Sequence, residues 1–472
     1  MQTKNLSPCA CTNTVLYTHP SSAMKVALSE EHHGDKNAPQ QSAAVNFRRA
    51  LTVAPTTILL AAIPLWLLLV SSPVQPRDYP LARPIEGKSS GPKGTDAAAG
   101  AAVPVVREKK CDVFKGKWVY RPDATAYYTN ETCYAISDQQ NCMKFGRPDT
   151  EFLKWRWEPD GCDLPPFDAS EFMEMVRGKS IAFVGDSVAR NHMQSLLCLL
   201  SSVEQPEDIS LRYSTDYNFK RWYFPNHNLT LATFWAPFLV RSTDARGGQT
   251  FNGVLSLHLD EPHPSWFSEI GAFHHVIISA GQWFFRPLVY YQNGQLLGCS
   301  ACGRDNVSEV SRFRAYQMAF RTTLKAIMGT KNREGGITFL RTFSPSHFEN
   351  GEWNNGGSCT RTKPFTTDEK KLEGYDLEFY LAQVEEFLEA ERRAREEGMK
   401  MRLLDMTRAM LLRPDGHPNR QCNWLKSNVA QADCVHWCLP GPIDTWNELL
   451  LYVMKSEQGV KFTQRKLQNA RS

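Results

Sequence analysis

Residues 50–70 form a hydrophobic run without a charged residue, ALTVAPTTILLAAIPLWLLLV. Its length is close to the ~20 residues that an α-helix needs to cross a bilayer. Arg48 and Arg49 precede the run, which favours a cytosolic N-terminus. A cleaved signal peptide normally starts near the first residue of a chain, so we predict an uncleaved transmembrane signal anchor over residues 50–71. Polar, proline- and glycine-rich flanks argue against a buried core helix at this place.

The segments on either side of this run lack the large apolar residues that a folded core needs. Residues 72–110 contain prolines, glycines, alanines and scattered charges, a composition typical of an extended linker. We therefore predict a disordered cytosolic tail over residues 1–49 and a luminal stem over residues 72–110.

Short apolar runs rich in β-branched residues alternate with segments of helical period from residue 181 onward. The predicted strands are 181–185, 275–280, 337–343 and 401–405, and the predicted helices are 188–200, 312–328, 372–397 and 443–454. This alternation predicts an α/β fold, a three-layer α/β/α sandwich with a mainly parallel sheet, over residues 166–460. In such sheets the site lies beyond the C-terminal ends of the strands.

Eleven of the thirteen cysteines follow residue 110. Together with a membrane segment, they indicate an oxidising lumen and disulfides. Cysteines and aromatic residues crowd residues 111–165, which predicts a small disulfide-stapled N-terminal subdomain with little regular structure. Cys299 and Cys302 form a lone CxxC, whereas a zinc ribbon needs two such pairs, so we expect no metal site. Asn130, Asn228 and Asn306 begin candidate glycosylation sequons.

The balance of charge bears on whether the protein binds nucleic acid. The formal net charge is +4 over 472 residues, and no run of Lys and Arg interleaved with aromatic residues is present. The sequence therefore gives no reason to expect a nucleic-acid partner.

The first candidate for chemistry is Ser187, in the string FVGDSVARN. Gly185, Asp186 and Ser187 join a predicted strand to a predicted helix, a place where a serine can be presented on a turn above a sheet. The helix N-terminus supplies backbone N–H donors beside the serine oxygen. Asp and Ser are also common helix caps, and the tripeptide by itself fits that structural role equally well.

A serine hydroxyl needs a base to accept its proton, and histidine suits that task near neutral pH. His436 follows Asp433 by three residues, a spacing that lets the carboxylate fix the imidazole tautomer. Cys434 and Cys438 could staple this loop. The rival bases are His417, His274 and His275.

Acyl transfer also needs donors for a tetrahedral oxyanion. Candidate oxyanion or substrate-binding residues are Gly281, Arg190, Asn191 and Trp283, beside the backbone N–H of Ser187. Gly281 fits a turn after a strand equally well, and Arg190 a surface ion pair. Trp283, Trp353, Trp437 and Trp446 lie close in sequence to the predicted strand-end loops, where aromatic rings either stack on sugars or pack in the core.

Several strings together resemble the plant trichome-birefringence-like family of polysaccharide O-acetyltransferases, whose catalytic domain is related to the SGNH/GDSL esterases. They are CDVFKGKWV (111–119), FVGDSVARNHMQSLLC (183–198), SAGQWF (279–284), FLRTFSPSHFENGEWNNGGSC (339–359), LLRPDGHP (411–418) and DCVHWCLPGPIDTWNELL (433–450). The resemblance covers the whole region expected to fold.

The resemblance implies a single-pass type II protein of the Golgi membrane whose luminal domain acetylates cell-wall hemicellulose. It implies Ser187, Asp433 and His436 as a catalytic triad, and an acetyl donor, acetyl-CoA or another acetyl carrier, with no resident cofactor. Other Golgi proteins of wall biosynthesis are candidate partners. The oxyanion Asn of SGNH esterases, in a GxND string, is absent; residues 344–357 or Arg190 are its candidate replacements.

The string YFPNHNLTLATFWAPFLV (223–240) is most similar to members that act on xyloglucan, at galactosyl or backbone glucosyl hydroxyls. Members that act on mannan or glucomannan are similar here too. An esterase that removes acetyl groups and a non-catalytic wall-polymer-binding protein are the alternatives from other functional classes.

Cysteine spacing does not fix a disulfide pairing. We predict the pairs Cys111–Cys162, Cys133–Cys198, Cys142–Cys438 and Cys359–Cys434, of which the last two would tie the His436 loop to the rest of the domain. Cys299 and Cys302 would pair locally, leaving Cys422 free.

Overall fold

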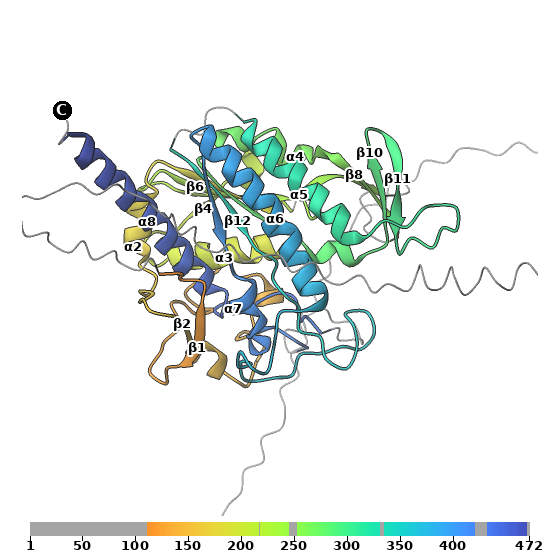
Figure 1. Ribbon diagram of the computed structural model, residues 1–472. Helices are drawn as coiled ribbons and strands as arrows, with labels where there is room; N and C mark the ends of the chain where they lie inside the picture. The colour runs from red at the N-terminus through yellow and green to blue at the C-terminus, as the bar shows by residue number, and fades with distance from the viewer. Residues whose placement is uncertain (1–110, 217, 245–252, 331–334, 421–431, 470–472) are drawn as a thin grey trace, which may run out of the picture. The chain divides into compact units, whose positions relative to one another are not determined.

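The computed structural model describes residues 111–472 except 217, 245–252, 331–334, 421–431 and 470–472 (Figure 1). The expected tail (1–49), anchor (50–71) and stem (72–110) lie outside the described residues, as does Cys422. Within the described part of the chain, no helix is long and apolar enough to cross a membrane.

A seven-stranded sheet organises the fold, with the strand order β13-β12-β9-β3-β6-β5-β4. Its strands are β3 (Ser180–Gly185), β4 (Glu207–Asp208), β5 (Lys220–Phe224), β6 (Leu229–Trp235), β9 (His275–Ser279), β12 (Ile337–Arg341) and β13 (Lys400–Leu404). The five strands from β13 to β6 run parallel, whereas β5 and β4 pair antiparallel at one edge. The mainly parallel sheet is therefore as expected.

Helices cover both faces of this sheet, and the alternation of side chains along β3 explains why. Ile181 and Phe183 join a buried cluster with residues of α3 (Ser187–Leu200) and α8 (Asp444–Asn469). Ala182 and Val184 point to the other face, into a cluster with residues of α5 (Arg312–Met328) and α6 (Gly374–Glu396). A strand buried on both faces needs apolar residues at successive positions, as SIAFVG provides.

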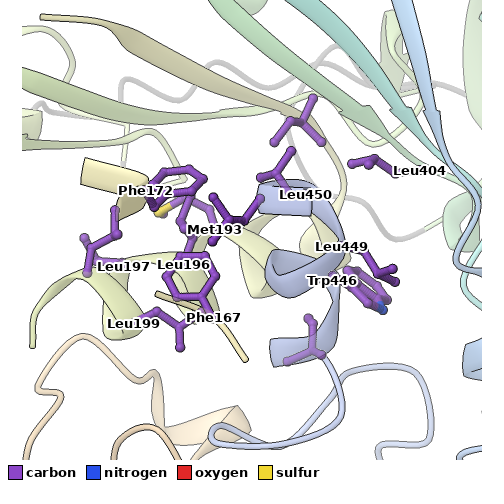
Figure 2. Close-up of a cluster of buried hydrophobic side chains, with 14 of the residues drawn as sticks. Phe167, Phe172, Met193, Leu196, Leu197, Leu199, Leu404, Trp446, Leu449 and Leu450 are labelled. Atoms are coloured by element: carbon purple, nitrogen blue, oxygen red, sulfur yellow. The ribbon is translucent and has the colours of Figure 1, made fainter. Parts of the chain in front are cut away.

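Figure 2 shows how the first of these layers is filled. Met193 and Leu196 of α3 lie beside Leu450 of α8, while Leu404, from the end of β13, borders the same cluster. Side chains spaced three or four residues apart share one face of a helix. The helix that begins at Ser187 is thus anchored along its length by its buried face, which fixes the position of its first turn.

A second sheet was not expected. It has the order β11-β10-β8-β7 and contains β7 (Val240–Asp244), β8 (Leu255–Pro262), β10 (Leu288–Gln292) and β11 (Gln295–Ser300). No strand was predicted between residues 200 and 275, so β4, β5, β6, β7 and β8 were all missed. Along β8, buried leucines alternate with half-buried residues, and this period of two was a signal that the sequence contained.

The remaining elements are short and connect or flank these layers. They are η1 (Asp138–Gln140), η2 (Glu151–Lys154), α2 (Ala169–Met175), η3 (Ser210–Arg212), α4 (Pro264–Phe267), η4 (Ile270–Ala272), η5 (Gln282–Phe285), α7 (Thr407–Leu411) and η6 (Pro414–Gly416).

The N-terminal subdomain contains one unexpected antiparallel pair, β1 (Gly116–Tyr120) with β2 (Trp155–Pro159). Trp118 and Trp157 meet across it edge to face, with ring centroids 5.6 Å apart. The indole of Trp118 donates to the carbonyl oxygen of Ala409 in α7 at 2.8 Å, which joins this pair to the larger part of the fold. Three disulfides lie in or leave the subdomain, Cys111–Cys162, Cys133–Cys198 and Cys142–Cys438, and each pair is the expected one.

Candidate active site

The turn between β3 and α3 presents Ser187 at the C-terminal edge of the parallel strands. Gly185 has a φ of 154°, and a Cβ there would lie 1.6 Å from the carbonyl oxygen of Ser279, so only glycine fits. Asp186 caps the helix, its Oδ1 accepting from the Val188 N–H at 2.9 Å. Ser187 is the first residue of α3, as the sequence predicted for a serine on a turn.

The buried carboxylate of Asp186 has a second role that the sequence did not reveal. Its Oδ2 accepts from the backbone N–H of Gly281 at 3.0 Å, which ties the serine turn to the segment after β9. Burial raises the pKa of Asp186, and the charge of the buried Arg341 opposes this rise. Asp186 is therefore both the helix cap and a bridge between two neighbouring strand ends.

His436 and Asp433 form the geometry expected of a base and its orienting acid. His436 Nδ1 lies 2.8 Å from Asp433 Oδ2, and Asp433 Oδ1 accepts from the backbone N–H groups of Val435 (3.1 Å) and His436 (3.0 Å). Burial acts to raise the pKa of Asp433, but the nearby imidazole outweighs it and brings the pKa to about 2. Burial likewise acts against charge on His436, but Asp433 outweighs it and raises the pKa of His436. The Nε2 atom of His436 is buried and has no hydrogen-bond partner among the described residues.

Ser187, Asp433 and His436 line one cavity of about 380 Å³. Aromatic and polar side chains complete its walls: Gln139, Gln282, Trp283, Phe285, Arg286, Ser346, Phe348, Glu352 and Trp353. A hydroxyl, a base with a free ring nitrogen and an orienting carboxylate in one cavity are the groups that nucleophilic acyl transfer needs.

Comparison with known proteins places this geometry in a family. Residues 164–453 match the GDSL/SGNH-like acyl-esterase family found in Pmr5 and Cas1p, and residues 109–163 match the PMR5 N-terminal domain. The chain belongs to this acyl-esterase family. The resemblance drawn from the sequence strings is thereby confirmed.

Three relatives are similar to this chain over about three quarters of its length. Protein trichome birefringence-like 20 of Arabidopsis thaliana is 52% identical over 74% of this chain and 73% of its own length. Xyloglucan O-acetyltransferase 4 of Populus trichocarpa is 45% identical, covering 75% of this chain and 83% of that protein. Xyloglucan O-acetyltransferase 1 of Arabidopsis thaliana is 42% identical, and the match covers 74% of this chain and 81% of that protein. The expected enzyme class, an O-acetyltransferase, agrees with two of these names.

The rival bases have other positions in this family member. His275 begins β9, and its Nδ1 accepts from the Ile337 N–H at 3.2 Å at the start of β12. His274 contacts Ser180 at the start of β3. Both lie at the N-terminal ends of the parallel strands, the edge opposite Ser187. His417 is 2% exposed and does not line the cavity. Of the four candidates, only His436 lines the cavity that contains Ser187.

Two of the candidate oxyanion donors have different roles in the structure. The Gly281 N–H donates to Asp186 Oδ2 in this structure, so it is not free to bind an oxyanion. Asn191 is 1% exposed; its Oδ1 accepts from the Trp437 N–H at 2.7 Å, and its Nδ2 donates to the Trp437 carbonyl at 3.2 Å. Asn191 therefore holds the backbone that follows His436 rather than facing a substrate.

The four candidate tryptophans divide into two kinds. Trp437 and Trp446 are fully buried in the core, so neither can stack on a sugar. Trp283 and Trp353 line the cavity, and the guanidinium of Arg286 lies over both rings, 4.1 Å from the first centroid and 5.8 Å from the second. Arg190 is half-buried, with its guanidinium 5.5 Å from the ring centroid of Trp235.

Two disulfides hold the segment that bears Asp433 and His436. Cys434 pairs with Cys359, and Cys438 pairs with Cys142. Cys299 pairs with Cys302 in β11 and the turn after it. These are the expected pairs. Among the described residues, no group of three or more His, Cys, Asp or Glu side chains could hold a metal ion.

The sequon asparagines lie outside the cavity. Asn228 and Asn306 are exposed, and Asn130 is half-buried. Asn228 has a φ of 48° and lies in the turn between β5 and β6, so its side chain is presented at a loop tip.

Proposed function

We propose that this protein transfers acetyl groups to hydroxyls of cell-wall hemicellulose, with xyloglucan as the acceptor, through an acetyl-Ser187 intermediate. The observation that carries the proposal is the meeting of Ser187, His436 and Asp433 in one cavity. The 42–45% identity to relatives named xyloglucan O-acetyltransferase supports the acceptor. The galactosyl or backbone glucosyl hydroxyls are the proposed positions, and mannan or glucomannan is the competing acceptor.

The first half-reaction acylates the serine. His436 Nε2 takes the proton of the Ser187 hydroxyl while the serine oxygen attacks the carbonyl carbon of the acetyl donor. The tetrahedral intermediate collapses, the bond to the donor's leaving group breaks, and that group takes the proton from Nε2. Acetyl-CoA or another acetyl carrier supplies the acetyl group, and no resident cofactor takes part.

The second half-reaction returns the enzyme to its starting state. An acceptor hydroxyl gives its proton to Nε2 and attacks the acetyl ester on Ser187. When the second tetrahedral intermediate collapses, the serine oxygen leaves and recovers the proton from Nε2. Asp433 remains ionised throughout, holding Nδ1–H and stabilising the imidazolium that forms twice.

The oxyanion formed in each step needs donors near Ser187. The backbone N–H of Ser187 lies at the N-terminus of α3, where the helix dipole favours negative charge. Arg190 is one turn further along, and its charge acts on His436, opposing protonation of that imidazole. We assign the oxyanion to these two groups, since the Gly281 N–H already donates to Asp186.

The acceptor occupies the wall formed by Trp283 and Trp353 in this proposal. Trp353 is 44% exposed, which leaves ring surface for the C–H face of a sugar. Burial lowers the pKa of Arg286, whose guanidinium lies over both rings. Two aromatic faces and one cation suit a neutral, hydroxyl-rich chain.

The proposed subcellular location rests on the sequence rather than on the cavity. We propose a single-pass type II protein of the Golgi membrane, with the anchor over residues 50–71, the catalytic domain in the lumen and other wall-biosynthesis proteins nearby. Five disulfides among the described residues are in keeping with an oxidising lumen. Protease protection of the tagged C-terminus in intact Golgi vesicles tests this topology, and cleavage without detergent would contradict it.

The test of function uses the purified full-length chain with an acetyl donor and oligosaccharides of xyloglucan, glucomannan and xylan. We expect a mass increase of one acetyl group on the xyloglucan oligosaccharide, abolished by Ser187→Ala. Acetylation of glucomannan alone would show that glucomannan, rather than xyloglucan, is the acceptor. Net deacetylation of an acetylated glycan without donor, and no transfer with donor, would favour the esterase. Retained biological function in Ser187→Ala would instead favour a wall-polymer-binding protein.

A further inference from the structure

Two buried imidazoles lie behind the segment that bears His436. His347 belongs to the string FSPSHFENG after β12 and is 6% exposed, while His417 belongs to LLRPDGHP and is 2% exposed. Their rings meet directly, with His347 Nδ1 2.7 Å from His417 Nε2. Neither ring lines the cavity, and neither has a role in the proposed acetyl transfer.

Both histidines hold the backbone around the proposed base. His417 Nδ1 lies 2.6 Å from the carbonyl oxygen of His436, and the backbone N–H of His347 donates to the carbonyl oxygen of Cys434 at 3.0 Å. The ring of His417 stacks on Trp437, with centroids 4.1 Å apart. At the far end of the pair, His347 Nε2 lies 2.9 Å from the carbonyl oxygen of Leu411.

These contacts form a chain that begins and ends on a carbonyl oxygen, and a carbonyl oxygen only accepts. His417 Nδ1 and His347 Nε2 must then each carry a hydrogen, which uses the one N–H of each neutral ring. The two remaining nitrogens would present lone pairs to one another at 2.7 Å. A proton between them gives each of the three contacts a donor.

We propose that His347 and His417 are positioning residues that hold the backbone of His436 through a chain of three hydrogen bonds. The two rings together carry three N–H protons, one more than two neutral imidazoles carry. The inference deepens the proposed function and rests on it, because His436 is the base of the proposed reaction. It gives a shared role to two strings that the triad leaves unexplained.

Charged groups on each side of the pair act on the third proton. Burial lowers the pKa of His347 to about 4 and that of His417 well below its ordinary value, because a charged ring loses its hydration. The charge of Lys370 acts on His347 in the same direction, and that of His436 on His417, whereas Asp433 favours the proton. Arg147 donates to the backbone carbonyls of His417 and Asp415, and the buried Asp415 is itself paired with Arg413 at 2.9 Å.

In this proposal, hydrogen bonding outweighs the cost of burying the third proton. Charge-assisted hydrogen bonds are roughly twice as strong as neutral ones, and the protonated pair makes three of them. The neutral pair makes two and places two lone pairs within 2.7 Å of each other. Loss of the third proton at alkaline pH would break one link of the chain and release the backbone of His436 or that of Leu411.

This arrangement predicts a second pH limb for catalysis. His436 must be neutral to accept the serine proton, so kcat rises with pH through the pKa of His436. The histidine pair must be protonated to hold the loop, so kcat falls with pH through the pKa of the pair. If the two rings had a merely structural role, replacing them would change kcat by the same factor at every pH.

The direct test is NMR of the full-length chain labelled with ¹⁵N in histidine, in detergent at pH 7. We expect one far-downfield N–H proton resonance that correlates with nitrogens of both rings and persists in Ser187→Ala. It should disappear in His417→Asn and in His347→Gln, and remain in His258→Gln, which alters a ring stacked on Tyr291. Two neutral imidazoles at pH 7 in the parent chain would overturn the inference without touching the proposed function.

Kinetics supply the second measurement. His417→Asn should lower kcat by about 10–100-fold at pH 7 while changing KM by less than about twofold, as is typical when a supporting hydrogen bond is lost. In His347→Gln an amide N–H can donate to His417 Nε2 without an added charge, so we expect a higher kcat than in His347→Ala and no alkaline limb. An alkaline limb that is unchanged in His347→Gln would also overturn the inference. Retained transfer in Ser187→Ala would overturn the proposed function instead, while leaving the NMR result intact.

Discussion

His436 Nδ1 lies 2.8 Å from Asp433 Oδ2, and the same carboxylate accepts the backbone N–H of His436 through its other oxygen at 3.0 Å. One side chain thus holds both the ring and the backbone of its neighbour. Because the two residues are three apart, a tight turn is enough to build this contact. The Nε2 atom of His436 is buried without a hydrogen-bond partner among the described residues, and His436 lines the cavity that contains Ser187.

The first prediction concerns Asp433. Asp433→Asn keeps the size of the side chain but removes the negative charge and can stabilise the wrong imidazole tautomer. By comparison with triads of the same type, we expect kcat to fall by about 10²–10⁴-fold. Acetyl transfer followed by mass measurement checks this, with thermal unfolding as the control for folding. A loss below about threefold would exclude Asp433 as the orienting acid.

The second prediction is the pH dependence of kcat/KM. Asp433 raises the pKa of His436 above its ordinary value, and the base acts only when it is neutral. Transfer should therefore be weak at acidic pH and rise through an apparent pKa above ~6.5, the ordinary value for histidine. In Asp433→Asn the residual activity should rise at a lower pH. An acidic limb at the same pH in both proteins would contradict this assignment.

The third prediction concerns Asn191, which bonds both the N–H and the carbonyl of Trp437. Asn191→Leu leaves these two buried backbone groups unpaired, at a cost of about 1–3 kcal/mol each in the free energy of unfolding. Since Trp437 follows His436 directly, we also expect kcat to fall by roughly 10-fold or more with little change in KM.

Gln194→Leu is the matched control for Asn191→Leu. Gln194 is on the same helix and half-buried, and its side chain donates to the carbonyl oxygen of Ala135 at 3.5 Å. We expect chemical denaturation and kcat to be affected much less than in Asn191→Leu. Equal losses of kcat in the two variants would mean that α3 as a whole, rather than the contact with Trp437, supports activity.

The fourth prediction compares two disulfides. Cys359–Cys434 closes a loop with a sequence separation of 75 and joins the segment of Trp353 to that of His436. Replacing both cysteines by serine should destabilise the protein by about 2–4 kcal/mol and lower transfer further through movement of the loop. Cys299–Cys302, with a separation of 3, is the control, and its removal should leave transfer nearly unchanged. The reverse order of effects on transfer would contradict the assigned role.

The fifth prediction concerns the acceptor. Trp353→Ala removes an exposed ring from the cavity wall, and we expect KM for the oligosaccharide to rise by roughly 10-fold, or about 1.4 kcal/mol, with a smaller change in KM for the acetyl donor. Trp353→Phe should recover part of this loss. Phe267→Ala is the control, because Phe267 is also 44% exposed but lies outside the cavity. A rise in donor KM alone would assign this wall to the donor.

The residues proposed for catalysis could be found in the sequence because each lies in a short segment with its own signal. The apolar run IAFVG predicts a strand, the glycine that ends it predicts a turn, and the spacing of Asp433 and His436 predicts their contact. The same holds for the long helices, because α5 shows its period of 3.6 over 17 residues. Short strands such as β4, with two residues, have no comparable signal.

Only the tertiary structure decided the contacts between residues that are far apart in the chain. The Gly281 N–H donates to Asp186, 95 residues away, and is therefore not free to bind an oxyanion in this structure. Asn191 bonds Trp437 across 246 residues, and His347 meets His417 across 70. Local propensity and period report only on the nearest neighbours of a residue in the chain. Which donor meets which acceptor between strand ends depends on the packing of the whole sheet and its helices, and no single segment specifies that packing.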